Sequence, residues 1–334
     1  MLEVLAPGLL PTIQDGGRPN AAHLGVPPCG ACDSWSFAIA NLLMGNPTDA
    51  PVLEITLAGP ELLVRETCTI ALTGSDLGAT SVGEGRPLTP GIAHTLWAGS
   101  TVRFERPASA DGPDGARACL ALAGGIDVPL VLGSASTCLV GGFGGIDGRA
   151  LQPGDVLVPA RRGDLSAAGR AWRPANRLGL VNASPIRVVP GPHLETVGMA
   201  ALSALVSGDW RVQTESDRMA VRLSGEPIAS ASGHSAMISV PMVWGAVQLP
   251  EHGQPIVLLA DHQTIGGYPV IAVIIRADWP RIGQLAPGAN VNFQPVSQEA
   301  ARKAWLDQQD ALGRIAREIS EDQSWDGAWL DAGG

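Results

Sequence analysis

Glycine and proline interrupt this sequence so often that only a few helices have room to form. The chain has 42 glycines and 27 prolines in 334 residues, and they separate short apolar runs. Frequent turns between short runs favour strands over long helices. The first half therefore predicts strands at 52–57, 62–65, 68–72, 94–97, 101–104 and 117–122. We expect a mainly β fold with a few helices, built as a barrel or a sandwich.

Three segments have the apolar spacing of helices. The first is 34–44, where Asp33 is a good N-cap and Gly45 ends the helix. Asn41 lies off its apolar stripe, which leaves it facing a pocket or solvent. The others are 194–206 and a long C-terminal segment from Ser297 to about residue 322.

The second half of the chain repeats features of the first half in the same order. Residues 186–189 and a Pro-Gly turn resemble Val4-Leu5 followed by Pro7-Gly8, and Leu223-Ser224-Gly225 resembles Leu57-Ala58-Gly59. Repeated features in the same order indicate two copies of one β-rich unit. We expect one domain over 1–184, with its boundary near Ser184, a second over 185–296, and a C-terminal helix with an acidic tail over 297–334.

Composition narrows the classes of function. The formal net charge is −10 and aromatic residues make up 4%, whereas nucleic-acid binding needs a basic surface, often with stacking aromatics. No apolar run approaches the roughly 18 residues that span a bilayer. The start, Met-Leu-Glu-Val, lacks the basic residues of a signal peptide. We therefore expect a cytoplasmic protein that binds neither nucleic acid nor membrane.

The chain has one lysine, Lys303, in a segment predicted to be a surface helix. A phosphate-binding P-loop, an amidase-signature active site and a biotin attachment site each require a lysine elsewhere. ATP or biotin, if either is used, is therefore expected on another chain. Cys29-Gly30-Ala31-Cys32 has zinc or thioredoxin spacing, but no second ligand pair accompanies it, so we predict no metal site.

The stretch Gln248–Pro269 has the pattern of a binding site. An apolar run at 256–260 predicts a buried strand, and Asp261, His262, Gln263 and Thr264 follow it directly. Gly266 and Gly267 then allow close approach of a ligand or another backbone, before Tyr268, the only tyrosine. A buried strand that ends in polar residues beside glycines is typical of binding sites. The alternative is a hairpin with a polar turn.

The same stretch resembles the signature of the KipA-like family, which is also known as allophanate hydrolase subunit 2, as a 5-oxoprolinase component or as the biotin-dependent carboxyltransferase family. The resemblance extends over about 1–296. Its further motifs are Gln14-Asp15-Gly16-Gly17-Arg18, Gly25-Val26-Pro27-Pro28, Ala123-Gly124-Gly125-Ile126-Asp127 and Leu132-Gly133-Ser134. It implies two cyclophilin-like β-barrel domains in tandem and a C-terminal helix.

The resemblance also implies one subunit of an amide-processing enzyme. The expected reaction is ATP-dependent hydrolysis of 5-oxoproline, or carboxyl transfer with a urea-like amide, at a site shared with a KipI-like subunit. A LamB-like subunit is a further expected partner. The alternative is a regulatory protein that sequesters a KipI-like kinase inhibitor. Allophanate hydrolysis by this chain alone is disfavoured by the single lysine.

A small amide needs donors for its carbonyl oxygen, acceptors for its N–H and a base. Glu54, Asp261 or Glu215 could act as the base if burial disfavours its charged form, and the residues leave that choice open. The candidate substrate-binding residues are Gln14, Asp15, Arg18, Asn41, Arg218, Gln248, Gln254, Gln263, Thr264, Gly266, Gly267 and Tyr268. An Asp15–Arg18 pair that braces a turn is an alternative for the first motif.

Overall fold

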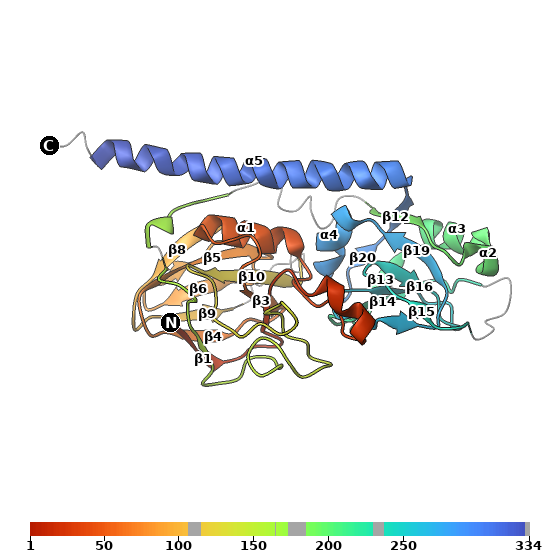
Figure 1. The fold of residues 1–334 in the computed structure, drawn as a ribbon, viewed down its shortest axis with the longest axis horizontal. Coiled ribbons are helices and arrows are strands. Elements are labelled where there is room, and N and C mark those ends of the chain that lie inside the picture. Colours follow the sequence, from red (N-terminus) through yellow and green to blue (C-terminus); the bar gives the residue numbers. More distant parts are fainter. Residues whose placement is uncertain (106–114, 164, 173–184, 230–236, 331–334) are drawn as a thin grey trace. The chain divides into compact units, whose positions relative to one another are not determined.

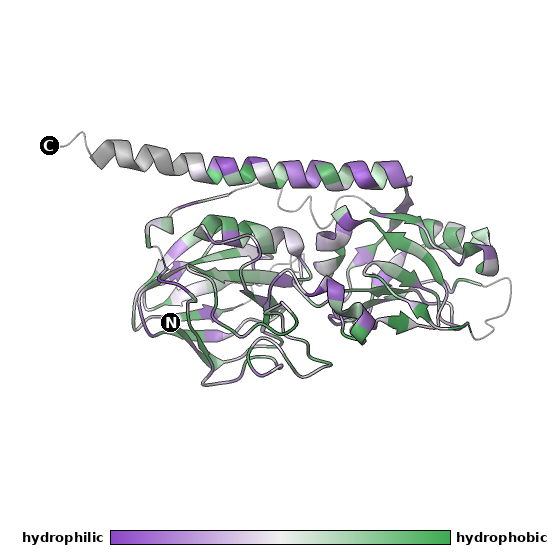
Figure 2. Ribbon diagram, in the orientation of Figure 1, coloured by the Kyte–Doolittle hydropathy of each residue, from purple (hydrophilic) through white to green (hydrophobic). Residues whose placement is uncertain are grey.

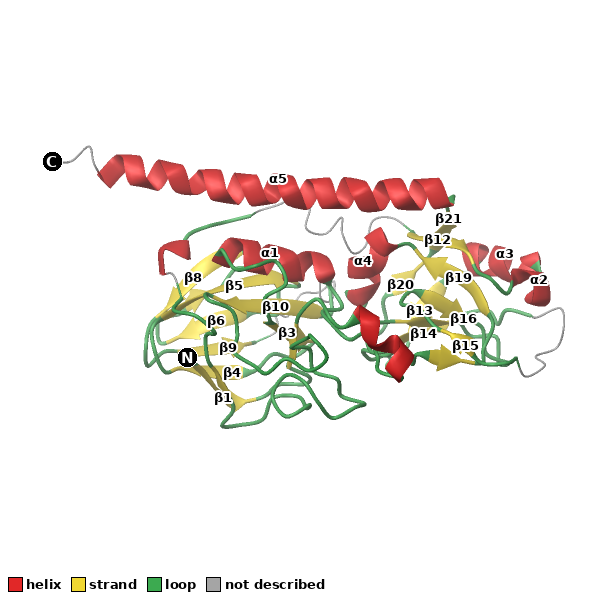
Figure 3. Cartoon of the chain, in the orientation of Figure 1, coloured by secondary structure: helices red, strands yellow, loops and turns green. Residues whose placement is uncertain are grey.

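The computed structural model describes residues 1–105, 115–163, 165–172, 185–229 and 237–330 (Figure 1). Its contacts define two compact units. Unit 1 comprises Met1–Gly16, Ser34–Arg177 and Asp307–Gly334, and unit 2 comprises Gly17–Asp33 and Leu178–Leu306. Figure 3 shows strands as the main element of both, with few helices. The predicted fold class, mainly β with a few helices and a C-terminal helix, is confirmed. The expected boundary near Ser184 lies outside the described residues.

Unit 1 contains two antiparallel sheets. The six-stranded sheet has the order β11-β1-β4-β9-β6-β7, and the five-stranded sheet has the order β2-β3-β10-β5-β8. The strands are β1 (Leu2–Ala6), β2 (Thr12–Gln14), β3 (Val52–Thr56), β4 (Glu61–Val64), β5 (Cys68–Gly74), β6 (Ala79–Val82), β7 (Arg86–Pro87), β8 (Ile92–Leu96), β9 (Thr101–Phe104), β10 (Arg117–Leu122) and β11 (Val156–Leu157).

The core of unit 1 lies between its two sheets. Leu2 and Leu62 come from the six-stranded sheet, Leu53 and Leu120 come from the five-stranded sheet, and all four are fully buried in one apolar cluster. Helix α1 (Ser34–Met44) packs against β5 and β10, so these central strands are buried along almost their whole length. A strand covered in this way is apolar without alternation. A short 3-10 helix, η2 (Leu165–Ala167), completes the unit.

Unit 2 is built on one eight-stranded sheet with the order β20-β13-β14-β17-β16-β19-β12-β21. All of its pairs are antiparallel except β12 with β21. A separate two-stranded ribbon pairs β15 with β18. The strands are β12 (Ile186–Pro190), β13 (Trp210–Val212), β14 (Ala220–Ser224), β15 (Val240–Pro241), β16 (Ala246–Gln248), β17 (Ile256–Leu258), β18 (Ile265–Gly266), β19 (Val270–Ile274), β20 (Asn290–Val291) and β21 (Phe293–Pro295).

The helix predicted at 194–206 is two helices, α2 (Leu194–Val197) and α3 (Met199–Ser207). Gly198 separates them with φ of 92° and ψ of 145°, a conformation that cannot continue a helix. Apolar spacing alone does not reveal such a break, because the apolar residues of α2 and α3 continue one stripe in the sequence. The other short helices of unit 2 are η1 (Pro19–Leu24), η4 (Arg276–Asp278) and α4 (Trp279–Gly283).

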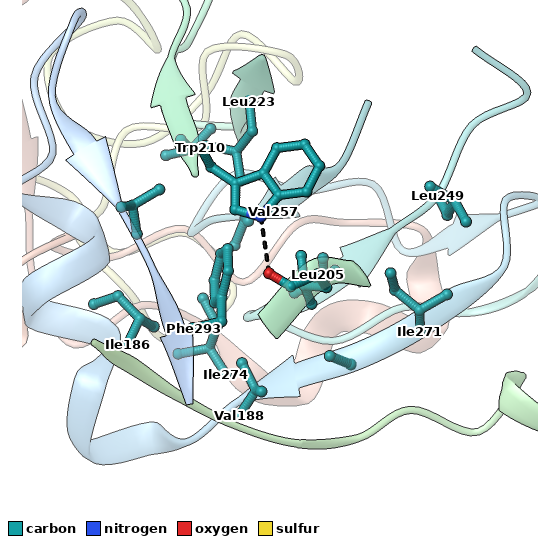
Figure 4. Close-up of a cluster of buried hydrophobic side chains, with 14 of the residues drawn as sticks. Ile186, Val188, Leu205, Trp210, Leu223, Leu249, Val257, Ile271, Ile274 and Phe293 are labelled. Carbon is teal, nitrogen blue, oxygen red and sulfur yellow. Dashed lines mark hydrogen bonds between the residues drawn. The ribbon is translucent and has the colours of Figure 1, made fainter. Parts of the chain in front are cut away.

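Trp210 is at the centre of the unit 2 core (Figure 4). It is 2% exposed, and its indole N–H donates to the Leu205 carbonyl at 2.8 Å. A methyl group at Gly225 would come within 2.7 Å of the indole ring. In unit 1 a methyl group at Gly59 would lie 2.3 Å from Phe104. The repeated glycines Gly59 and Gly225 therefore have the same packing role, because each makes room for an aromatic ring.

Helix α5 (Gln298–Leu330) is the long C-terminal helix, and it begins close to the predicted residue. Within unit 2 its Trp305 ring lies 4.1 Å from the Arg276 guanidinium, which also lies 5.6 Å from Trp279. Cation–π contacts of this kind fix the start of the helix. Figure 2 shows mixed hydropathy along the coloured part of α5, and Lys303 is exposed on this helix as predicted. In the described part of the chain, no helix combines the length and apolarity needed to traverse a bilayer.

Candidate functional site

Asp261 follows β17 at the predicted polar rim, and its partner is Arg218. The guanidinium donates to both carboxylate oxygens, with Nε–Oδ2 at 2.9 Å and Nη2–Oδ1 at 3.0 Å. The two residues are 3% and 2% exposed, so this is a buried, two-pronged ion pair. The Asp261 N–H also donates to the Arg218 carbonyl. Asp261 is thus held by a fixed cation, which favours a positioning role for it over that of a free base.

The loop Gly17–Asp33 is attached to this ion pair. Arg218 Nη2 donates to the Gly30 carbonyl at 2.7 Å, and Nη1 lies 3.4 Å from the Cys32 sulfur. The Cys29 N–H donates to the Ala260 carbonyl at 2.9 Å. Arg218 therefore joins three parts of unit 2: the bend that precedes β14, the end of β17 and this loop. The Cys29–Cys32 motif, which the sequence offered only as a metal or redox pair, lies in this loop, and both of its side chains are buried thiols.

Gln248 and Gln263 form an amide pair beside the rim. Gln263 Nε2 donates to Gln248 Oε1 at 3.2 Å, and Gln248 Nε2 donates to the Met242 sulfur at 3.3 Å. A thioether sulfur is only an acceptor, so the nitrogen of Gln248 is the atom that faces it. Gln248 is 1% exposed, and a thioether accepts weakly. Its amide therefore retains hydrogen-bonding capacity that the described side chains do not use.

Gly266 lies directly against the amide pair. A methyl group at this position would come within 2.8 Å of Gln248 Nε2, 3.2 Å of Met242 and 3.3 Å of Gln263 Nε2. At Gly267 the nearest atoms would be 3.5 Å away, which is ordinary contact. Only glycine fits at position 266, because a side chain would collide with both amide nitrogens, and the Gly266 backbone therefore packs closely against the amide pair.

The other predicted residues of this stretch have different environments. Gln254 makes two hydrogen bonds to the backbone of Gly225, so its amide braces a turn. The Thr264 carbonyl accepts from the Met242 N–H in the ribbon of β15 and β18. Tyr268 is 48% exposed. Of the predicted residues, Arg218, Gln248, Asp261, Gln263 and Gly266 are joined by these contacts around the end of β17.

Glu215 does not meet the condition that made it a candidate base. The residue is exposed, and its carboxylate accepts from the Thr214 hydroxyl at 3.0 Å. The burial that would disfavour its charged form is therefore absent at this position.

Asp15 belongs to unit 1, where a short polar segment encloses it. Its Oδ1 accepts from the Ser134 and Ser136 hydroxyls at 2.6 and 2.5 Å, and its Oδ2 accepts from the Ala135 N–H at 2.6 Å. Gln14 is fully buried beside it and donates to Thr12 and to the Thr137 carbonyl. These bonds favour a structural role, because they use the capacity that a ligand would need.

Arg18 lies on the other side of the Gly16–Gly17 step, in unit 2. It is 2% exposed, and its N–H donates to the Pro28 carbonyl at 2.7 Å. The Gln14–Arg18 motif is thus divided between the two units, and its second half belongs to the loop that Arg218 holds.

Glu54 and Asn41 are buried in unit 1 with partners of their own. Glu54 Oε1 lies 3.7 Å from Arg117 Nε, and both side chains are almost fully buried. Asn41 donates to the Ala50 carbonyl at 2.8 Å and accepts from Asn46 at 3.1 Å. Neither expected arrangement for Asn41, a pocket or an exposed helix face, matches this buried amide network, which ties α1 to the following loop.

The described residues include no group of three or more histidine, cysteine, aspartate or glutamate side chains arranged to hold a metal ion. The groups gathered after β17 are an amide pair, Gln248 and Gln263, and an ion pair, Arg218 and Asp261. Such a set can bind and orient a neutral polar group, and it can exchange hydrogen bonds with an amide in both directions.

The chain is of the carboxyltransferase class by its sequence family. It belongs to the family described as carboxyltransferase domain, subdomain A and B, whose model matches residues 24–295. The resemblance drawn from the sequence is confirmed.

Individual relatives agree with this assignment. The chain is 37% identical over 318 residues to a 5-oxoprolinase component of Escherichia coli (strain K12), in an alignment that covers 95% of this chain and 98% of that protein. It is 31% identical to the urea amidolyase of Saccharomyces cerevisiae, over 90% of this chain and 17% of that protein. The crystal structure of Kluyveromyces lactis urea carboxylase matches with a TM-score of 0.84 and 30% identity, over 94% of this chain and 29% of that chain.

Proposed function

We propose that this chain is one subunit of a multi-subunit enzyme that processes a small amide, with ATP-dependent hydrolysis of 5-oxoproline as the reaction. The observation that carries the proposal is the buried Gln248 amide, whose nitrogen has only a weak thioether acceptor and lies against Gly266. Such a donor suits the carbonyl oxygen of a lactam or urea, where charge develops during acyl chemistry. The 5-oxoprolinase relative from Escherichia coli, which the chain matches almost end to end, supports the choice of 5-oxoproline.

Asp261 and Arg218 have a positioning role in this proposal. Their ion pair fixes the turn after β17, and this turn presents Gln263 to Gln248. Rigid support of this kind holds the Gln248 and Gln263 amides, which one hydrogen bond joins, in a fixed geometry. The base that removes a proton is then supplied by another group of the assembled enzyme.

The proposed partners are a KipI-like subunit, which shares the site, and a LamB-like subunit. In this proposal the complex uses ATP, and another chain binds it, because this chain lacks a P-loop lysine. A urea-type carboxyl transfer is the related possibility, supported by the urea amidolyase relatives. Biotin has a ureido ring with the same –NH–CO– edge as a lactam, so the Gln248 amide fits that ring as well. The single lysine, Lys303, is exposed in α5, so biotin would be carried by another chain.

Reconstitution tests the proposal directly. This chain is mixed with the KipI-like and LamB-like proteins of the same organism, singly and together, and glutamate formation from 5-oxoproline is measured with and without ATP. We expect ATP-dependent glutamate only from the complete mixture. A complex that forms but yields no glutamate would contradict the choice of substrate, and release of ammonia from allophanate by the isolated chain would contradict the need for partners.

A methyl group at Gly266 tests whether activity depends on the position of the Gln248 amide. Gly266→Ala places a carbon 2.8 Å from Gln248 Nε2, so the amide pair must move. We expect kcat/KM of the complex to fall about 100-fold, as a small displacement of an aligned group does. Gly267→Ala is the matched control, because its methyl group meets only ordinary contacts and activity should be retained. Equal activities of the two variants would exclude this use of Gly266.

A further inference from the structure

The tight hairpin at residues 131–134 of unit 1 has an unusual residue in its turn. The backbones of Val131 and Ser134 exchange two hydrogen bonds, at 2.9 and 3.2 Å, so Leu132 and Gly133 are the two loop residues. Both have positive φ, 52° and 78°. A two-residue turn with this conformation selects asparagine, aspartate or glycine at its first position, because other side chains are strained there. The turn therefore disfavours the leucine that it contains.

Packing within the chain does not explain the leucine at position 132. Leu132 is 51% exposed, and Leu130, two residues before it, is 67% exposed. Leu57 is another leucine with left-handed φ, 58°, but its side chain is partly buried. A strained conformation at an exposed apolar residue, which the local packing does not compensate, indicates a functional constraint on that side chain.

Both ends of the hairpin are fixed to the body of unit 1. Before the hairpin, Ile126 is buried, and the Asp127 N–H donates to the Val158 carbonyl at 2.8 Å. After it, the buried Asp15 carboxylate accepts from the Ser134–Ser136 segment at 2.6, 2.6 and 2.5 Å. A projection that is held on both sides loses little conformational entropy when it binds, so the hairpin is preorganised for contact.

The tip of the hairpin carries no charge. Residues 128–133 are Val-Pro-Leu-Val-Leu-Gly, and among them Pro129, Leu130, Leu132 and Gly133 are exposed. Charged residues are depleted at the centre of protein interfaces, where side chains are fully desolvated. We propose that Leu130 and Leu132 insert into an apolar recess of the partner subunit with which this chain assembles. This assignment rests on the proposed function and adds a surface through which the complex forms.

A different polypeptide fits this projection better than a second copy of the chain does. The region matched to this chain is 29% of the Kluyveromyces lactis urea carboxylase and 17% of the Saccharomyces cerevisiae urea amidolyase, so those proteins carry further polypeptide besides it. In the proposed function, other subunits supply that polypeptide. Two copies in a two-fold contact would set one projection against another instead of against a recess. The formal net charge of −10 on each copy also opposes their approach.

The experiment measures the dissociation constant between this chain and the KipI-like protein of the same organism by calorimetry. The variants are Leu132→Gly and Leu132→Asn, because glycine and asparagine both adopt left-handed φ readily. Leu165→Asn is the matched control, since Leu165 is a 50% exposed leucine of the same unit, in η2. The thermal midpoint of each variant is measured, and sedimentation of the chain alone detects association between copies.

Both Leu132 variants should weaken the association about 10- to 100-fold, the effect of losing one buried leucine side chain. Their thermal midpoints should equal or exceed that of the wild type, because the strain at φ of 52° is relieved. Leu165→Asn should leave the dissociation constant unchanged. A thermal midpoint that falls by several degrees in both Leu132 variants would assign the leucine to the packing of unit 1 and overturn the inference.

The outcomes separate this inference from the proposed function. Unchanged dissociation constants for both Leu132 variants would overturn the inference, while glutamate formation by the wild-type complex would leave the proposed function standing. Weakened association of the variants, with no glutamate from the wild-type complex, would support the interface and overturn the choice of substrate. A wild-type chain that binds no KipI-like protein would overturn both. A dimer of this chain that Leu132→Gly dissociates would overturn the choice of partner.

Discussion

Replacement of Arg218 by alanine should reduce the free energy of unfolding by about 3–5 kcal/mol. The change leaves the Asp261 carboxylate at 3% exposure without its cation. It also removes the hydrogen bond to the Gly30 carbonyl, which attaches the Gly17–Asp33 loop. A buried charge without a partner is far more costly than the loss of an ordinary contact. Urea unfolding followed by tryptophan fluorescence measures the effect.

Two further variants show whether the buried charge is the cause. Arg103→Ala removes an exposed pair with Glu61, and its loss should stay below about 1 kcal/mol. Arg218→Met combined with Asp261→Leu removes both charges and should be less destabilising than Arg218→Ala alone. A loss under about 1 kcal/mol for Arg218→Ala would mean that the pair does not hold the site together.

Much of the fold was predictable because its signals are local. The strands at 101–104 and 117–122 begin and end as predicted, since glycine, proline and apolar runs mark both boundaries. The helices after Asp33 and at the C-terminus also begin close to the expected residues. The break at Gly198 was missed because a single glycine inside an apolar stripe does not determine its own conformation.

The site was predictable only in part, because its partners are far apart in the sequence. The polar residues after β17 were identified from a local pattern, and the Gln248–Gln263 pair spans only 15 residues. Arg218 reaches Gly30 over 188 residues, and Asp15 reaches Ser134 over 119. No local periodicity encodes such pairings. The sequence therefore left two interpretations of Asp15 open, a ligand site or a pair with Arg18, and did not indicate the Ser134–Ser136 segment that hydrogen-bonds to its carboxylate.

Gln248→Met tests whether the Gln248 amide binds the carbonyl oxygen of the substrate. Methionine has a similar length and volume but no N–H, so the core contacts are largely kept while the donor is lost. Removal of one preorganised donor to a developing oxyanion costs about 100- to 1,000-fold in rate. We therefore expect kcat/KM of the assembled complex for 5-oxoproline to fall by about that factor.

Gln254→Met is the matched control, because Gln254 is an amide of the same unit that bonds only to the Gly225 backbone in the described structure. The decisive measurement is kcat/KM of the complex with the wild-type chain, Gln248→Met and Gln254→Met, each established as folded by its thermal midpoint. We predict a loss of about 100-fold or more for Gln248→Met and under about threefold for Gln254→Met. Equal activity of Gln248→Met and the wild type would contradict it.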